Sequence, residues 1–310
     1  MSGQDEQPTL RTVADAAGVS IATASHAFNR PDRVGPATRE RVLAAARALN
    51  YSGPNPAARA LRRQNVGSLT LTVARNMAEF WTRPAAVRFC AGVAATCDRV
   101  GVTMNILRPG ELLGGPTVAF RPDPEQVLPG AQIVVVDTAG IDRPSITADT
   151  ETACRQLVDY LAQLGHRGLA IVGWAGETAR RDQLIAAWGD RGRLKVVNAR
   201  GLGRGDGEAA VLAALADGSD ITAIAAVADE LALGAIDGVH RLGRRVPVDM
   251  SVVGLDDIPE AQFRGLTTAF VPYGPMGEMA AEFALNGGPL PPAFPVPIAL
   301  RHSVAAARSS

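Results

Sequence analysis

The chain has 310 residues with 31 basic and 31 acidic side chains, and 47 % of its residues are hydrophobic while 20 % are charged. This composition excludes a disordered chain, and no run of apolar residues approaches the roughly 18 that a spanning helix needs. The length predicts two or three folding units. The polar, acidic first residues do not fit a secretory signal, so we expect a cytoplasmic protein.

Positive charge is concentrated at the amino-terminal end. Residues 1–65 hold nine basic against five acidic side chains, and the remaining residues balance this excess. A local excess of this kind is typical of a surface that binds nucleic-acid phosphates, although any one arginine is equally typical of a solvated surface. The candidates for phosphate contact are Arg11, Arg33, Arg39, Arg59, Arg62 and Arg63.

The stretch LRTVADAAGVSIATASHAFNRP, residues 10–31, predicts two short helices joined by a tight turn. Gly18 can take the left-handed conformation that ends a helix, and Ser20 offers an oxygen to the free amides of the next one. The alternative is one amphipathic helix interrupted by a glycine. The spacing favours a helix-turn-helix, because small residues at Ala14 and Ala17 let two helices cross closely.

A third helix and a linker follow. Residues 36–50 have proline at the first helical position and a basic last turn, and their apolar face would complete a three-helix core with Val42, Ala45, Ala46 and Leu49. Two prolines in residues 53–65 frame a helical segment that is too short to be stable alone. We therefore divide the chain into a head (1–52), a hinge (53–65) and a larger domain (66–310).

In the larger domain, β-branched runs alternate with helical patterns, which predicts a parallel sheet with helices on both faces. Strands are expected over 66–73, 102–107, 131–137, 168–174, 194–199, 221–227 and 251–257, and helices over 85–100, 151–164, 206–216 and 230–242. Ligands bind at the carboxyl ends of the strands of such sheets. The polar residues at these ends are Asp137, Asp229, Asp256 and Asp257.

Several segments carry a family resemblance. TLRTVADAAGVSIATASHAFN, with TRERVLAAARALNY and NPAARAL, resembles the head of the lactose/galactose repressor family of bacterial transcription regulators. ALGAIDGVHRLGRRVPVDMSVVGLDDIP and LTTAFVPYGPMGEMAAE resemble its effector-binding domain, which is similar to periplasmic sugar-binding proteins. The resemblance implies an α/β chain with a small all-α helix-turn-helix head and a two-lobed effector domain with parallel sheets.

The resemblance also implies a homodimer, in which the second helix of each head lies in the major groove of palindromic double-stranded operator DNA. Such a protein is a transcriptional regulator, and we expect a repressor that responds to a sugar or a related metabolite. His26 stands where the family often has arginine, and histidine cannot make the bidentate guanine contact. The implied DNA-contact residues are Leu10, Arg11, Ser20, Ile21, Ala22, Thr23, Ser25, His26, Asn29, Arg33, Thr38, Asn55, Ala58 and Leu61, the last as a wedge in the minor groove.

For the effector, the resemblance implies a cleft lined by residues from several strands. Asp256 matches the ligand-binding aspartate, although capping of the next helix is an alternative role. An arginine near the fourth helix of this domain could be Arg180 or Arg181. The implied effector contacts are Phe80, Trp81, Asp137, Arg181, Asp229, Asp256 and Tyr273.

Other readings have less support. GLGRGDG at 201–207 looks like a dinucleotide loop, but its glycines do not fit the required spacing, so a flexible turn is expected. The four histidines lack metal-ligand spacing, His166 is expected at a helix end where it favours the dipole, and no serine lies in a nucleophile elbow. The three cysteines are expected to be reduced core residues. We expect no enzyme, cofactor or metal, and the rival reading is a small-molecule-binding protein with a non-regulatory head.

Overall fold

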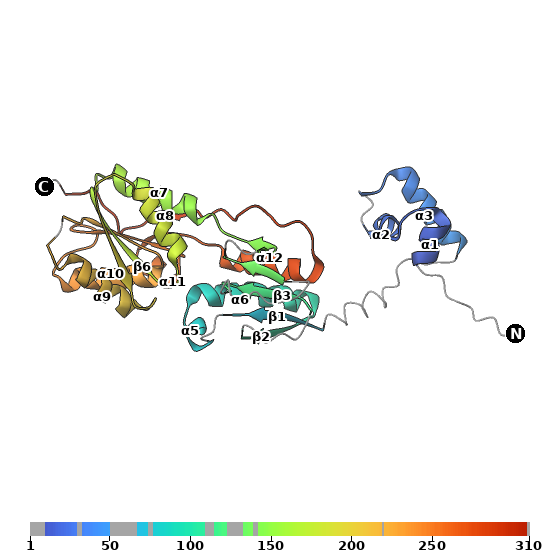
Figure 1. Cartoon of the computed structure of the whole chain (residues 1–310), viewed down its shortest axis with the longest axis horizontal. Coiled ribbons are helices and arrows are strands. Elements are labelled where there is room, and N and C mark those ends of the chain that lie inside the picture. Colours follow the sequence, from blue (N-terminus) through green and yellow to red (C-terminus); the bar gives the residue numbers. More distant parts are fainter. Residues whose placement is uncertain are drawn as a thin grey trace. The chain divides into compact units, whose positions relative to one another are not determined.

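The computed structural model describes residues 10–29, 33–49, 67–73, 77–108, 115–122, 133–138, 142–218 and 220–308. The chain divides into two compact units, Met1–Gly67 and Ser68–Ser310 (Figure 1). The predicted hinge, 53–65, lies outside the described residues, and with it Asn55, Ala58 and Leu61.

The head contains α1 (Leu10–Ala17), α2 (Ile21–Asn29) and α3 (Pro36–Ala48). Gly18 has a φ of 62°, and the Thr23 amide donates a hydrogen bond of 3.1 Å to Ser20 Oγ, so the predicted turn and helix cap are confirmed. The three helices share a small apolar core of Val13, Ala14, Ala24, Ala27, Val42 and Ala46.

The prediction for the third helix was too long. Leu49 lies one residue beyond the end of α3 and is 37 % exposed, so it does not belong to the core of the head. Ala45 packs against that core and is only half-buried. The helix ends because the Leu49 φ and ψ of −91° and 5° have left the helical range.

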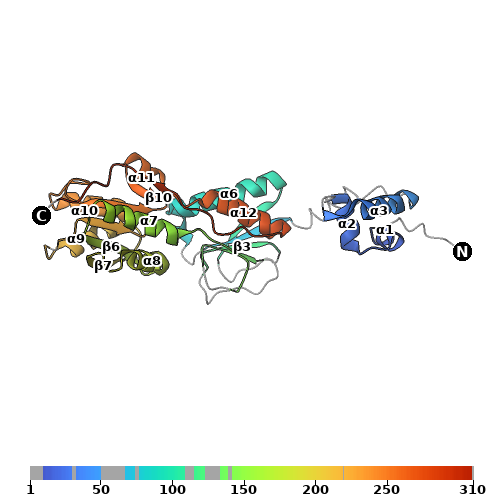
Figure 2. The same ribbon diagram turned by 90° about the horizontal axis from the view of Figure 1, so that it is seen from above.

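The second unit begins with a lobe built on a parallel five-stranded sheet in the order β2-β1-β3-β4-β5. Two long helices lie side by side against it, and they come from distant parts of the sequence (Figure 2). The elements of this first lobe are β1 (Ser68–Thr72), α5 (Met77–Trp81), α6 (Pro84–Val100), β2 (Thr103–Leu107), β3 (Thr117–Phe120), β4 (Ile133–Val136), β5 (Ser145–Ile146) and α12 (Tyr273–Asn286).

The second lobe holds a six-stranded sheet in the order β11-β10-β9-β8-β6-β7, which is parallel except for β11. In Figure 1, α7 and α8 lie along one face and α9 and α10 along the other. Its elements are α7 (Thr150–Gln163), β6 (Gly168–Trp174), α8 (Thr178–Trp188), β7 (Arg193–Ala199), α9 (Arg204–Leu215), β8 (Ala223–Ala226), α10 (Asp229–Arg241), β9 (Ser251–Leu255), α11 (Pro259–Phe263), β10 (Thr267–Ala269) and β11 (Ile298–Ala299).

The chain passes between the lobes three times, at 147–149, 270–272 and 287–297. Two of these segments pair where the Asp149 amide donates to the Phe294 carbonyl at 2.8 Å. Parallel sheets with covering helices confirm the predicted α/β class, and the strand ends of both lobes meet at the crossings. Tyr273, the first residue of α12, follows one crossing directly.

The expected flexible turn at 201–207 is wrong, because α9 begins at Arg204 within it. Gly207 and Gly234 face each other where α9 and α10 cross, and a Cβ atom on either would collide with the backbone of the opposite helix. The glycines therefore permit close helix packing and do not form a loop.

His166 lies at the C-terminal end of α7, as predicted, and its amide donates to the Leu161 carbonyl at 3.2 Å. Its side chain does not suit the predicted dipole role. It is buried, with Nδ1 2.9 Å from Thr222 Oγ1 and Nε2 3.0 Å from the Ala305 carbonyl. Burial lowers the pKa of His166 below its usual value, which disfavours the charged form that a dipole interaction needs. The prediction of a dipole role is therefore wrong.

Cys90, Cys97 and Cys154 are free and buried, as predicted. Within the described ranges, no helix is long and apolar enough to cross a membrane. The same residues include no group of three or more His, Cys, Asp or Glu side chains placed to hold a metal ion.

Candidate functional site

Strained backbone marks one place in the second unit. Four non-glycine residues among those described have positive φ: Arg121 (45°), Asp137 (58°), Asp256 (118°) and Asp257 (52°). Arg121 directly follows β3, Asp137 directly follows β4, and Asp256 and Asp257 are the two residues after β9. Such strain persists where the surrounding structure has to hold a side chain in place, and it clusters at functional sites.

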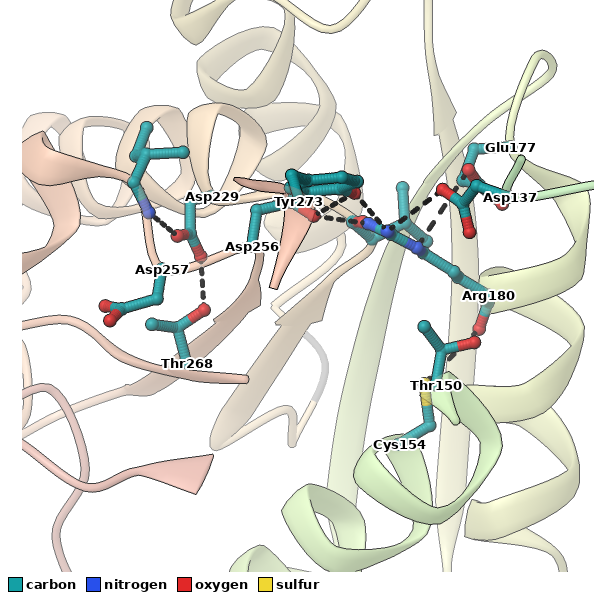
Figure 3. A network of polar contacts seen from close by, with 12 residues as sticks. Asp137, Thr150, Cys154, Glu177, Arg180, Asp229, Asp256, Asp257, Thr268 and Tyr273 are labelled. Atoms are coloured by element: carbon teal, nitrogen blue, oxygen red, sulfur yellow. Dashed lines mark hydrogen bonds and ion pairs between the residues drawn. The ribbon is translucent and has the colours of Figure 1, made fainter. Parts of the chain in front are cut away.

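A buried arginine lies at the centre of this place (Figure 3). Arg180, on α8, is only 3 % exposed, and its Nη1 donates to Asp256 Oδ1 at 2.8 Å. Its Nη2 donates to the Tyr273 hydroxyl at 2.6 Å, and that hydroxyl donates to Asp256 Oδ1 at 2.8 Å. The three side chains thus form a closed triangle of charge-assisted hydrogen bonds.

A second arginine adjoins the first. Arg121 Nε donates to Asp137 Oδ2 at 2.7 Å, and Arg121 Nη2 lies 3.3 Å from Glu177 Oε2. Arg121 Nη2 also donates to the Tyr273 hydroxyl at 3.1 Å. Glu177 in turn lies 3.9 Å from Arg180 Nε. We call Arg121, Arg180, Asp137, Glu177, Asp256 and Tyr273 the cleft cluster, which joins first-lobe to second-lobe residues.

The protonation states follow from burial and charge. Burial alone would raise the pKa of Asp137, but the neighbouring Arg121 and Arg180 lower it below the usual value, so this carboxylate is ionised. Burial raises the pKa of Tyr273 well above its usual value, so the hydroxyl keeps the proton that it donates to Asp256. The ionised Asp137 thus lies between two guanidinium groups, those of Arg121 and Arg180.

Aromatic rings line one side of the cluster. Phe120 stacks on Phe89 with ring centroids 4.3 Å apart and meets the Tyr273 ring edge-on at 6.2 Å. Phe80 meets Phe120 edge-on at 6.1 Å, so this predicted effector residue joins the row. Trp81 contacts Phe80 but is 43 % exposed, and no described contact joins it to the cleft cluster.

Two predicted effector residues lie elsewhere. Arg181 pairs with its neighbour Asp182 at 2.9 Å, so Arg180 and not Arg181 is the arginine of the cluster. Asp229 is fully buried and turned away: Thr268 Oγ1 donates to it at 2.5 Å and the Ile258 amide at 2.9 Å. Burial and the nearby Asp256 raise the pKa of Asp229 well above its usual value, which suits a structural group.

Sequence reasoning missed Arg121 and Glu177. Arg121 directly follows the run Thr-Val-Ala-Phe, whose four residues form β3, and a polar residue at the end of such a run was the available signal. Glu177 precedes α8 as its N-cap residue, and nothing in its local sequence distinguishes it from an ordinary helix-start residue. Arg121 meets Asp137 from 16 positions away along the chain, and it meets Glu177 from an element of the other lobe.

The head presents its own candidate surface. On α2, Ile21 is 45 % exposed, Ala22 is exposed, and Thr23, Ser25 and His26 are half-buried. Arg11, Arg33 and Arg39 are exposed, and Thr38 is half-buried. The backbones of Leu10 and Asn29 are helical, but their side chains lie outside the described part of the structure. The second helix thus turns an uncharged, mainly small-residue surface outward.

Comparison with known proteins finds two family models in the chain. The model described as bacterial regulatory proteins, lacI family, matches residues 9–55, and the periplasmic binding protein-like domain matches residues 158–304. A curated HTH-type transcriptional regulator of Mycobacterium tuberculosis is 33 % identical, over 94 % of this chain and 92 % of that protein.

Solved structures agree in fold. The lac repressor dimer bound to operator and the anti-inducer ONPF superimposes with a TM-score of 0.67 at 22 % identity, covering 97 % of this chain and 100 % of that one. The complex of the transcriptional regulator CelR with cellobiose gives a TM-score of 0.66 at 23 % identity, covering 96 % and 99 %. These likenesses concern the fold, since identity is low.

Proposed function

The chain belongs to the lacI family of bacterial regulatory proteins, and we propose that it acts as a homodimer that binds palindromic operator DNA under the control of a small-molecule effector. The observation that carries this proposal is the helix-turn-helix itself: a capped second helix with exposed Ile21 and Ala22, in a head with excess positive charge. The relatives are named as transcriptional regulators, and one solved neighbour holds operator DNA.

The division of labour is part of the proposal. Residues 1–52 form the DNA-binding head, 53–65 the hinge with Leu61 as minor-groove wedge, and 66–310 the effector-binding and dimerisation domain. The effector is a sugar or a related metabolite bound at the cleft cluster, and the regulator is a cytoplasmic repressor without enzymatic activity. The charge-assisted bonds of Arg180 and Asp256 suit polar ligands.

The DNA surface can be tested with two exposed apolar residues of the same head. Ile21→Ala removes a side chain that contacts a thymine methyl in our proposal, so affinity for the selected operator duplex should fall about tenfold, or 1.4 kcal/mol. Leu49→Ala truncates a residue of similar exposure beyond α3 and should leave affinity unchanged. Fluorescence anisotropy with a duplex from the chain's own upstream region, and with a scrambled duplex, measures both.

The salt dependence of DNA binding distinguishes a regulator from the alternative, a small-molecule-binding protein with a non-regulatory head. A regulator whose basic head neutralises phosphates loses affinity steeply with salt but keeps its preference for the operator. A small-molecule-binding protein with a non-regulatory head would show no sequence-selective complex at any salt concentration. Equal losses for Ile21→Ala and Leu49→Ala would contradict the assignment of the second helix as the reading helix.

A further inference from the structure

The guanidinium group of Arg121 is surrounded by acidic side chains, a hydroxyl group and aromatic rings, as a bound cationic ligand would be. The Arg121 side chain is 23 % exposed and lies between Asp137 of the same lobe and Glu177 of the second lobe. The Tyr273 hydroxyl accepts a further bond from it. Its guanidinium carbon lies 5.7 Å from the centroid of the Phe120 ring and 5.9 Å from that of the Tyr273 ring. Cation-binding sites in proteins commonly combine carboxylates with the faces of aromatic rings.

The charge balance depends on this side chain. With Arg121 in place, two guanidinium groups face the carboxylates of Asp137, Glu177 and Asp256. Without it, Arg180 alone faces all three. Asp137 and Glu177 are 13 % and 14 % exposed, so water solvates them poorly and an unpaired carboxylate there is unfavourable.

Other first-lobe arginines also reach the second lobe. The Arg83 guanidinium lies 4.8 Å from the centroid of the Trp174 ring, at the end of β6. Arg88 Nη1 donates to the Asp257 carbonyl at 2.8 Å. These contacts lie at the same strand ends as the cleft cluster, so the lobes are joined there by the chain's own cations.

We propose that Arg121 is an internal occupant of the effector cleft, holding the lobes together until a ligand with its own guanidinium or ammonium group replaces it before Asp137 and Glu177. This rests on the proposed function, in which the cleft binds the effector. A neutral ligand that displaced Arg121 would leave these poorly solvated carboxylates with the more distant Arg180, which lies 4.0 Å from Asp137 and 3.9 Å from Glu177. A cationic ligand would restore their nearer partner. Within the proposed class, the effector is then an amino sugar or a related polar metabolite that carries a positive charge.

The test is chemical rescue in the full-length chain. Arg121→Ala should lower the thermal midpoint of the larger unit by about 5 °C, because it leaves Asp137 and Glu177 without their cation. Millimolar methylguanidinium should restore at least half of that loss with a saturable dose response. Methylurea, which has the same shape without the charge, should restore none of it. Arg99→Ala is the matched control, since this arginine pairs with Glu282 at the surface.

A second variant covers the case in which Arg121→Ala does not fold. Glu177→Gln keeps the pair within the first lobe and removes only the charge on the second, so small-angle X-ray scattering should show a larger radius of gyration than for the parent. An unchanged radius together with an unchanged midpoint would overturn the proposal, as would equal effects of methylguanidinium and methylurea on Arg121→Ala. Neither experiment depends on DNA. Failure to bind operator DNA would therefore contradict the proposed function and leave these two results unaffected.

Discussion

Two neighbouring arginines on α8 show how burial decides the value of a charge. Arg180 is 3 % exposed and bonds Asp256 and Tyr273, whereas Arg181 is 22 % exposed and pairs with Asp182, which is 61 % exposed. Removal of one partner from a buried ion pair leaves the other charge uncompensated, which costs far more than loss of a surface pair.

Arg180→Ala should therefore lower the free energy of unfolding of the larger unit by about 3–5 kcal/mol. Arg181→Ala, its matched control one residue away, should change it by no more than about 0.5 kcal/mol. Urea titration followed by tryptophan fluorescence measures both values. Similar losses for the two variants would show that the cleft cluster does not hold the buried charge that its geometry indicates.

Glu230 is a further titratable group of the same region. Burial and the neighbouring Asp256 raise the pKa of this carboxyl to about 7, while Arg83 and Arg180 act in the opposite direction. A carboxyl with a raised pKa binds its proton more tightly in the folded state than in the unfolded state. The contribution of Glu230 to stability is therefore complete at a pH below its pKa in the unfolded state, and it is lost as the pH rises through about 7. The charge near the cleft thus changes close to neutral pH.

Among the helices, the α9 and α10 pair depends on small residues at the crossing. A Cβ atom at Gly207 would collide with the Leu231 carbonyl, and one at Gly234 with the Arg204 carbonyl. At Gly205, which lies in α9 with Gly207, a Cβ atom would meet nothing within 4 Å. The close packing of α9 against α10 therefore requires glycine at both Gly207 and Gly234.

Gly207→Ala should therefore destabilise the larger unit by about 1–3 kcal/mol, because the helices have to separate. Gly205→Ala, in the first turn of α9, should stabilise it by up to about 1 kcal/mol, since alanine favours a helix more than glycine does. Both are read from denaturant midpoints. A stabilising Gly207→Ala would contradict the close crossing, and a destabilising Gly205→Ala would point to a contact at that position.

The whole chain divides into two compact units, and we expect them to unfold separately. Among the described residues of the head, the core consists of six small apolar side chains, with Val42 among the largest. A core of this size supplies little stability, about 3–5 kcal/mol for a small domain. The larger unit has its own extensive core and does not depend on it.

Val42→Ala should cost the head about 2 kcal/mol and melt it at a lower temperature, while the transition of the larger unit stays in place. Differential scanning calorimetry separates the two transitions, and circular dichroism follows the loss of head helix. Thermal unfolding of the larger unit together with the head would contradict this independence. Ala44→Ser, at an exposed position of α3, serves as the control.

The sequence alone determined the features that depend on residues close together in the chain. Gly18 and Ser20 set the turn of the head, and Asp137 and Asp256 were found because they follow strand patterns. Hydrophobic periodicity predicted the helices α6, α7, α9 and α10 and the strands β1, β2, β4, β6, β7, β8 and β9. Caps, turns and periodicity act over a few residues, so they can be read without a fold. The sequence Thr-Val-Ala-Phe of β3 was missed, whereas the Ile-Val-Val-Val of β4, which has the same length, was predicted because every residue of it is β-branched.

Only the tertiary structure decided which charged groups meet. It placed Arg180 and not Arg181 beside Asp256, turned Asp229 toward Thr268, and brought Arg121 to Glu177. These contacts join residues of different lobes or strands, and their energies depend on burial, which removes water from the charges and strengthens their attraction. Local sequence holds no record of burial, since two adjacent arginines look alike until the packing of the helix separates them.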